Sequence, residues 1–277
     1  MKTQRLLIVL TVALALPACP AAAQTTESRL DSPPEVSKTD APFGTGTRAV
    51  QWIKVSAPDV GVMLAAVARP RGAGPFPTVV LLHGTHGFAG EYVRLAEDLA
   101  AGGVMAVAAC WFREHGHKQP FITPIDCPHA PPMPDPLSAE AVRIVDTLVQ
   151  AARTLPDARS DRIALFGHSR GGGAALGYVL RVGNVQSAVL NSAPYPARAS
   201  ADIKAPILIL HGTNDNPADG GGPGTNIDRV REFEAKVRAA GKPVEAVYYD
   251  GGRHNDIFLS STQHRDEVRQ ILEFLLR

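Results

Sequence analysis

The chain has 277 residues, a formal net charge of +1 at pH 7 and 45% hydrophobic residues. This length and composition are typical of an ordinary globular protein with one α/β domain. The near-neutral charge balance gives no electrostatic basis for binding nucleic acid or an anionic membrane surface, and we expect neither as a partner.

The first 23 residues have the pattern of a secretory signal peptide. Lys2 and Arg5 form a basic start, residues 6–16 are apolar but too few to span a bilayer, and an A-x-A cleavage site ends at Ala23. We therefore expect export to the periplasm or the medium. The alternative is a lipoprotein, because residues 16–19 resemble a lipobox that would place a lipid anchor on Cys19, with an unusual proline at its second position. No other stretch predicts a membrane span.

After the signal peptide, residues 24–46 are rich in Ser, Thr, Pro, Asp and Gly and predict a flexible N-terminal tail. The folded domain is then 47–277. It begins with two strands, 47–56 and 60–68, joined by an Ala-Pro-Asp turn that predicts a hairpin.

From residue 78 onward, apolar strand-like runs alternate with helical patterns. The predicted strands are 78–82, 104–109, 163–166, 185–190, 207–210 and 244–249, and the predicted helices are 91–101, 138–155, 169–182, 225–240 and 261–276. Continuous apolar strands that alternate with helices indicate an α/β fold with a mostly parallel, doubly wound sheet of about eight strands and helices on both faces. In such sheets ligands bind at the C-terminal ends of the strands.

Residues 111–137 form the longest stretch without periodicity and carry seven prolines. Because this loop follows a strand end, we expect it to border the substrate site. Cys110 and Cys127 flank or lie in it, and an even pair of cysteines in an exported protein favours a disulfide, although only geometry can decide. His115 and His117 with Cys127 and His129 match no standard zinc spacing, so we expect no metal and no cofactor.

The strand 163–166 runs into Gly167-His168-Ser169-Arg170-Gly171, and a small-residue helix pattern follows. This G-x-S-x-G arrangement between a strand and a helix is typical of a nucleophile elbow. Gly167 and Gly171 are small because a Cβ there would collide with the adjoining strand or helix. Ser169 is therefore the predicted nucleophile.

A serine nucleophile needs a base and an acid that orients the base. Asp215 follows the strand 207–210 and is the predicted acid; its rival Asp219 lies in a glycine-rich stretch that would hold a histidine poorly. His254 follows the strand 244–249 and is the predicted base.

Four other histidines are predicted to be non-catalytic. His83 and His211 end strands and are expected to hold loops, His168 is expected to point away from the substrate, and His264 is expected on the surface of the last helix.

An oxyanion hole needs two N–H donors. One is predicted to be the backbone of Arg170, after the nucleophile, and the other Thr85 in the loop after strand 78–82, with His86 as runner-up. The Arg170 side chain is expected to pair with an acid on the helix surface; the alternative is that Arg170 and Arg113 hold a substrate carboxylate.

Together, the loop 83–88, the elbow 167–172, Asp215 and the Gly-Arg-His at 252–254 resemble an α/β-hydrolase. The short spacing between Ser169 and Asp215 is similar to the dienelactone-hydrolase-like branch, and the resemblance covers about residues 48–277. The chain departs from dienelactone hydrolases in having Ser169 where they use cysteine and Gly84 where they carry a glutamate. Secreted polyesterases share the Gly-His-Ser-x-Gly-Gly elbow.

These patterns predict an exported serine hydrolase that cleaves small-molecule carboxylic esters, or lactones or thioesters, through a Ser-His-Asp triad and an acyl-enzyme. One alternative is a secreted polyesterase or lipase-like enzyme. The alternative of another class is a non-catalytic binding protein on the same scaffold.

Overall fold

The computed structural model describes residues 32–42, 45, 49–113 and 120–277, so the signal peptide, Cys19, His115 and His117 lie outside the described residues. The strands are β1 (Glu35–Lys38), β2 (Val50–Ala57), β3 (Gly61–Ala68), β4 (Phe76–Leu82), β5 (Met105–Ala109), β6 (Ala158–His168), β7 (Ala188–Asn191), β8 (Ile207–Gly212) and β9 (Val244–Tyr249). The helices are α1 (Gly90–Ala101), α2 (Ala139–Thr154), α3 (Arg170–Arg181), α4 (Ile227–Ala239), α5 (Asp256–Leu259) and α6 (Ser261–Leu275), with a 3₁₀ turn η1 at Pro217–Asp219.

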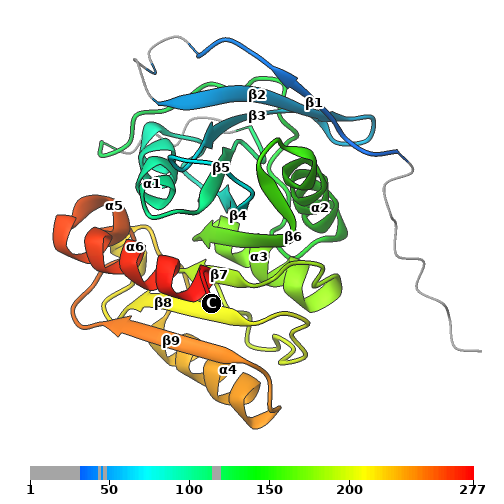
Figure 1. The fold of residues 1–277 in the computed structure, drawn as a ribbon. Coiled ribbons are helices and arrows are strands. Elements are labelled where there is room, and N and C mark those ends of the chain that lie inside the picture. The colour runs from blue at the N-terminus through cyan, green and yellow to red at the C-terminus, as the bar shows by residue number, and fades with distance from the viewer. Residues whose placement is uncertain (1–31, 43–44, 46–48, 114–119) are drawn as a thin grey trace, which may run out of the picture.

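The strands form a single nine-stranded sheet in the order β1-β2-β3-β5-β4-β6-β7-β8-β9 (Figure 1). The three N-terminal strands are antiparallel, and β3 pairs antiparallel with β5. From β5 to β9 every neighbouring pair is parallel. All parallel strands therefore present their C-terminal ends at the same edge of the sheet, where the predicted site residues follow them.

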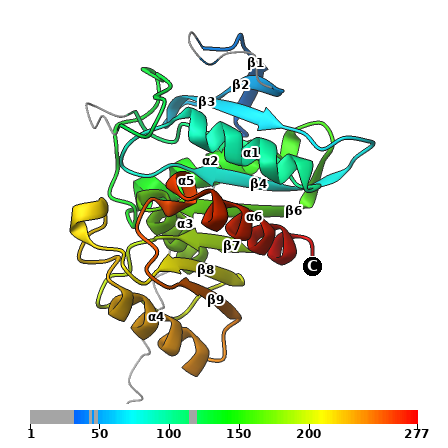
Figure 2. The same cartoon turned by 90° about the vertical axis from the view of Figure 1, so that its left-hand side faces the viewer.

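Helices cover both faces of the sheet, and alternate strand residues pack against each layer. One core joins α2, α3 and α4 to strand residues such as Val80, Leu165 and Ile209, and the other joins α1, α5 and α6 to their neighbours Val79, Phe166 and Leu208. In Figure 2, α1 and α6 lie in front of the sheet, with α2 and α3 behind it. The doubly wound arrangement predicted from the sequence is confirmed.

Most predicted elements are present with ends shifted by a few residues. The predicted helix start at Ser138 is confirmed in detail, since its hydroxyl accepts the Ala141 N–H at 3.1 Å and caps α2. The largest shift is in β6, which begins at Ala158 instead of residue 163 because its first residues are polar and solvent-facing, and so give no apolar run.

The sheet has one strand more than the eight counted in the sequence, because β1 lies within the segment predicted to be a flexible tail. Its residues Glu-Val-Ser-Lys are exposed except for half-buried Val36, which packs against the core. A four-residue edge strand with one inward side chain carries too little periodicity to be recognised in a sequence. The tail prediction is therefore wrong for these residues.

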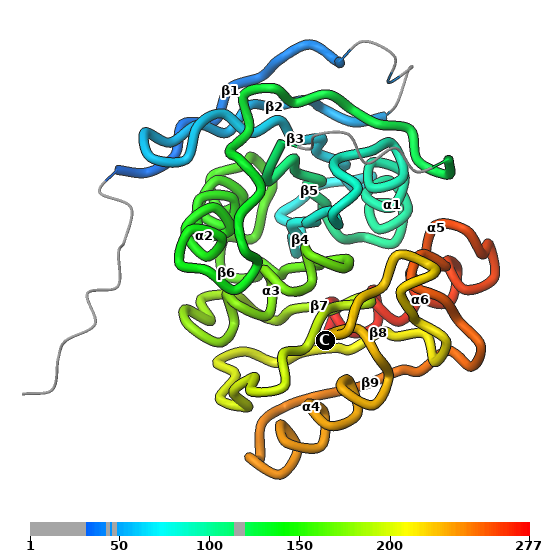
Figure 3. The backbone as a smooth tube through the Cα atoms, turned by 180° about the vertical axis from the view of Figure 1, so that it is seen from behind, coloured from blue at the N-terminus to red at the C-terminus, as the bar shows by residue number. Residues whose placement is uncertain are grey.

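Residues 120–137, which precede α2 and are green in Figure 3, pass the β1–β3 end of the sheet. The His129 carbonyl accepts the Val62 N–H from β3 at 3.1 Å, and Pro124 forms an isolated bridge with Ala89 at the start of α1. Among the described residues, no helix is both long and apolar enough to cross a membrane.

Candidate active site

Ser169 stands on a sharp turn between β6 and α3 with φ 53° and ψ −120°, a conformation that non-glycine residues rarely adopt. A Cβ on Gly167 would lie 2.2 Å from the Gly171 carbonyl oxygen, and one on Gly171 would lie 2.2 Å from the Leu82 carbonyl oxygen. The backbone contacts that enforce the turn thus require glycine at both positions, as the elbow pattern predicted.

Three predicted residues meet in one hydrogen-bonded chain. The His254 Nε2 atom lies 2.9 Å from Ser169 Oγ, and His254 Nδ1 lies 2.8 Å from Asp215 Oδ2. The His254 and Asp215 side chains are 3% and 0% exposed. Because a carboxylate oxygen only accepts hydrogen bonds, Nδ1 carries the hydrogen and Nε2 directs its lone pair at the Ser169 hydroxyl.

Asp215 is held by more than His254. Its Oδ1 atom accepts the Thr225 hydroxyl at 2.7 Å, and His211 Nε2 lies 3.4 Å from Oδ2. The rival Asp219 faces elsewhere: its carboxylate accepts the Asn216 side-chain N–H at 3.1 Å and its carbonyl accepts Asn255 Nδ2 at 2.9 Å. The structure therefore brings Asp215, and not Asp219, to the histidine.

The loop after β4 lies directly against Ser169. A Cβ on Gly84 would be 3.2 Å from Ser169 Cβ and 3.0 Å from His168 Nδ1. The next residue, Thr85, is half-buried, and within the described chain its backbone N–H has no acceptor. The Arg170 N–H begins α3, where intrahelical bonding leaves amides unpaired. Both predicted donors thus lie on segments that border Ser169.

Among the described residues, no acid pairs with the Arg170 side chain, so the prediction of such a partner is wrong for this part of the chain. The Arg170 Nε donates to Thr85 Oγ1 at 3.3 Å and its Nη1 donates to the Pro134 carbonyl at 2.8 Å. The guanidinium therefore links the loop after β4 to the long loop before α2, two segments whose approach the sequence does not reveal.

The histidines with predicted structural roles are buried and hydrogen-bonded. His83 Nδ1 donates to the Gly84 carbonyl at 2.9 Å, and His211 Nε2 donates to the Thr225 carbonyl at 2.7 Å. Burial lowers the pKa of His83 to about 3 and also lowers the pKa of His211. His168 is fully buried and its Nε2 lies 3.1 Å from the His254 carbonyl.

His264 is not a free surface residue, contrary to the prediction. Its Nδ1 bonds the Ile257 carbonyl and its Nε2 bonds Asp98 Oδ2, both at 2.8 Å, and its side chain is 16% exposed. The ring therefore ties α6 to α5 and α1.

Glu267 is a buried carboxyl that the sequence reasoning missed. The Ser169 N–H donates to the Asn191 carbonyl at 2.9 Å, and Asn191 Nδ2 lies 2.5 Å from Glu267 Oε2. Gln263 Nε2 donates to the other carboxyl oxygen at 2.7 Å. Burial raises the pKa of Glu267 to about 8. The sequence signal was its place four residues before Ile271, on the apolar stripe of α6.

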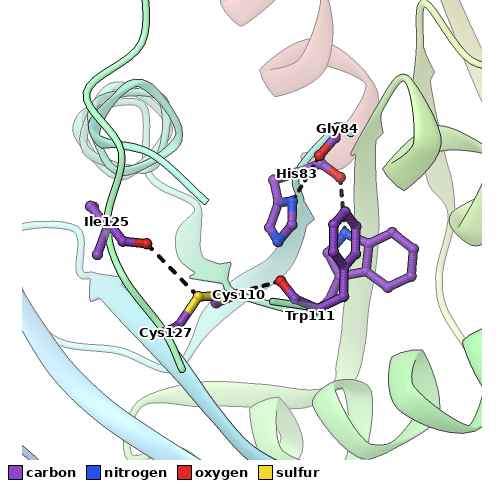
Figure 4. The surroundings of a disulfide bond; sticks show 7 residues. His83, Gly84, Cys110, Trp111, Ile125 and Cys127 are labelled. Atoms are coloured by element: carbon purple, nitrogen blue, oxygen red, sulfur yellow. Dashed lines mark hydrogen bonds between the residues drawn. A yellow bond between two sulfur atoms is a disulfide. The ribbon is translucent and has the colours of Figure 1, made fainter. Parts of the chain in front are cut away.

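The long loop is tied to the end of β5 by a disulfide between Cys110 and Cys127, so the favoured pairing is confirmed (Figure 4). Next to it, the Trp111 indole donates to the His83 carbonyl at 2.9 Å. A bridged Cys127 has no thiolate to offer a metal. This removes Cys127 from the group of possible ligands that also contained His115, His117 and His129.

Reducing this disulfide is expected to destabilise the protein by about 3 kcal/mol, because a bridge over a loop of this length restricts the unfolded chain. Thermal unfolding with and without dithiothreitol measures the loss. The Cys110→Ala/Cys127→Ala double variant is the control, since its melting temperature must not respond to the reductant. An unchanged melting temperature in the fully reduced wild type contradicts the expectation.

Comparisons with known proteins agree with the fold and point to one family. The model of the dienelactone hydrolase family matches residues 63–269. A Methylorubrum extorquens protein assigned as a carboxymethylenebutenolidase is 30% identical over 207 residues, which are 70% of this chain and 68% of that protein.

Two similar solved structures show the same fold. A Klebsiella pneumoniae protein assigned as a dienelactone hydrolase superposes with a TM-score of 0.62 and 19% identity over 88% of this chain and 99% of its own. Thermogutta terrifontis esterase 2 gives a TM-score of 0.57 and 18% identity over 77% of this chain and 88% of its own. The family match and the α/β-hydrolase fold lead to one assignment: the chain belongs to the dienelactone hydrolase family and is a hydrolase that acts on esters.

Proposed function

We propose that the chain is an exported serine hydrolase that cleaves carboxylic esters, lactones or thioesters through Ser169, His254 and Asp215. The observation that carries the proposal is the chain of two hydrogen bonds, 2.9 Å and 2.8 Å long, from the serine hydroxyl through the imidazole to the carboxylate. A binding protein would have no need to hold a serine in a strained conformation with a buried base aimed at it.

The geometry supports an acyl-enzyme route. His254 Nε2 takes the proton from Ser169 Oγ as the oxygen attacks the carbonyl carbon, and Asp215 stabilises the imidazolium that forms. The backbone N–H groups of Arg170 and Thr85 hold the negative oxygen of the tetrahedral intermediate. The imidazolium then returns its proton to the leaving group, and water releases the acid by the same steps in reverse order.

A soluble substrate fits the described surface better than a polyester. Among the described residues, the large hydrophobic side chains that are exposed are Met133, Leu259 and Leu276, which lie on different segments. An enzyme that works on a polymer surface would need a contiguous apolar rim. The Ser169 and Gly84 departures point away from dienelactone itself, so we propose small acyclic esters as the first substrates to test.

Export is supported by the signal-peptide pattern at 1–23, followed by the mature chain from residue 24, and by the disulfide, since such bonds persist in oxidising compartments. Fractionation of expressing cells checks it: mature protein in the cytoplasmic fraction contradicts export. Incorporation of labelled palmitate that is lost in Cys19→Ala would instead establish the lipid-anchored form.

A serine-reactive fluorophosphonate tests the function. We expect it to label the mature wild type stoichiometrically and Ser169→Ala not at all. Ser160→Ala is the matched control, because Ser160 is exposed near the other end of the same strand, β6. Hydrolysis of p-nitrophenyl esters of increasing chain length then measures acyl preference, against release from a polyester film. An unlabelled wild type would favour the non-catalytic alternative.

A further inference from the structure

The hydroxyl of Tyr92, on α1, is buried beneath the proposed active site and meets polar atoms from two other segments. Its oxygen accepts the Gly84 N–H at 2.8 Å, and it lies 2.9 Å from His86 Nε2 and 3.0 Å from His168 Nδ1. As whole residues, Tyr92 and His168 are 1% and 0% exposed. Water therefore has no access that would let it replace these contacts.

The direction of each hydrogen bond follows from one carbonyl. His168 Nε2 lies 3.1 Å from the His254 carbonyl, which only accepts, so Nε2 carries the hydrogen. Burial holds the pKa of His168 well below its usual value, so the ring is neutral and its Nδ1 is bare. Tyr92 must therefore donate its single hydroxyl hydrogen to His168 Nδ1. His86 Nε2 must then be the donor to the second lone pair of the Tyr92 oxygen.

This arrangement uses every donor and acceptor site of the hydroxyl, and its partners are the neighbours of the reacting groups. Gly84 and His86 flank Thr85, the proposed oxyanion donor. His168 precedes Ser169 and holds the His254 backbone through its other nitrogen. The rings also pack together, with centroids 5.2 Å apart for His168 and His254. One oxygen atom thus connects the loops that carry the oxyanion donor, the nucleophile and the base.

We propose that the Tyr92 hydroxyl is a positioning group for the reaction, which holds the Thr85 N–H and the His254 ring in the arrangement that the transition state requires. The inference rests on the proposed function, since it assigns no chemistry of its own to Tyr92. It predicts an effect on the chemical step and not on ground-state binding, because the hydroxyl has all its hydrogen-bonding sites occupied by protein groups.

Tyr92→Phe removes the hydroxyl and keeps the ring. Normalised to the sites that fluorophosphonate labels, kcat should fall roughly 10- to 100-fold while KM changes less than about twofold, as expected for a small displacement of catalytic groups. Inhibition by a trifluoromethyl ketone, whose adduct with Ser169 places an oxyanion in the hole, should weaken by a similar factor. Tyr178→Phe is the matched control: its buried hydroxyl donates to Asp146 at 2.8 Å between α3 and α2.

Both tyrosine variants lose a buried hydrogen bond, so a purely structural role predicts lower melting temperatures in both and the same kcat per labelled site. That result for Tyr92→Phe would overturn the inference. If Tyr92→Phe does not fold, His86→Leu removes one donor to the same oxygen and should lower kcat, and His86→Gln, which keeps an N–H, should recover part of the loss. Equal kcat in the two His86 variants would overturn the inference. An unlabelled wild type would instead reject the proposed function on which it rests.

Discussion

Replacing Asp215 by asparagine is expected to lower kcat by about 10⁴-fold with little change in KM. The amide presents an N–H as well as a C=O, and Thr225 already donates to the Oδ1 position, so the amide nitrogen turns toward His254. His254 Nδ1 would then have to accept, which places its hydrogen on Nε2 and removes the lone pair that deprotonates Ser169. The fold is expected to persist, because the substitution conserves shape.

The kcat and KM of p-nitrophenyl acetate hydrolysis, determined across a range of pH, measure this effect. Asp219→Asn is the matched control, since it makes the same change four residues away on a carboxylate whose partner is Asn216. It should keep kcat near the wild-type value. A loss of only a few-fold in Asp215→Asn, or an equal loss in Asp219→Asn, would mean that Asp215 does not set the tautomer of His254.

The free energy of unfolding is expected to peak near pH 6.5 and to fall steeply in acid. Burial lowers the pKa of His83 to about 3 and of His86 to about 4, from the usual 6.5, and also lowers those of His168 and His211. The unfolded chain binds these protons first as the pH falls, so stability present above pH 6.5 is lost below it. His83 and His86 each contribute a slope of about 1.4 kcal/mol per pH unit between their folded and unfolded pKa values, and His168 and His211 act in the same direction.

Glu267 acts in the opposite direction. Its folded pKa of about 8 exceeds the usual 4.5, so it favours the folded state fully below pH 4.5, and this contribution is lost as the pH rises to 8. Above pH 6.5 the histidine terms are constant and the Glu267 slope remains, at about 1.4 kcal/mol per pH unit. Stability should therefore decline on both sides of a maximum.

Urea unfolding at pH intervals from 4 to 9 measures both slopes. His83→Leu should reduce the acid slope by about one proton. Glu267→Gln should flatten the alkaline side and steepen the slope between pH 4.5 and 6.5 by about one proton, because the Glu267 contribution that opposes the histidines there is lost. The slope of the unfolding free energy against pH reports the loss of a titrating group, whereas the absolute free energy also reports lost packing. A free energy of unfolding that is flat between pH 4 and 6.5 would contradict the burial of neutral histidines.

Local patterns were sufficient to predict the elbow and the two residues that complete the hydrogen-bonded chain from Ser169. Gly167 and Gly171 signal a turn that tolerates no Cβ, and Asp215 and His254 each follow an apolar strand, so sheet topology brings them to one edge. The positions of Asp215 and His254 could be predicted because parallel strands end at the same edge of the sheet. That inference needs only the period of the hydrophobic pattern.

Partners that depend on long-range packing could not be predicted in the same way. Arg170 looked like a surface cation, but the path of the loop before α2 offers it the Pro134 carbonyl. His264 looked exposed, but α1 supplies Asp98 to its ring. Both errors concern side chains whose partners lie on segments far away in sequence, and no local period encodes such contacts.

The strand β1 also affects how the molecule avoids self-association. Strand β2 carries Trp52, Ile53 and Val55, and without β1 its backbone N–H and C=O groups would form an open, apolar edge. The short strand covers this edge with its register from Glu35 opposite Ser56 to Lys38 opposite Ile53. The strand β1 is only four residues long and carries charged side chains. Its own free edge is therefore a poor template for pairing with another chain. The short strand β1 thus protects the sheet against edge-to-edge aggregation.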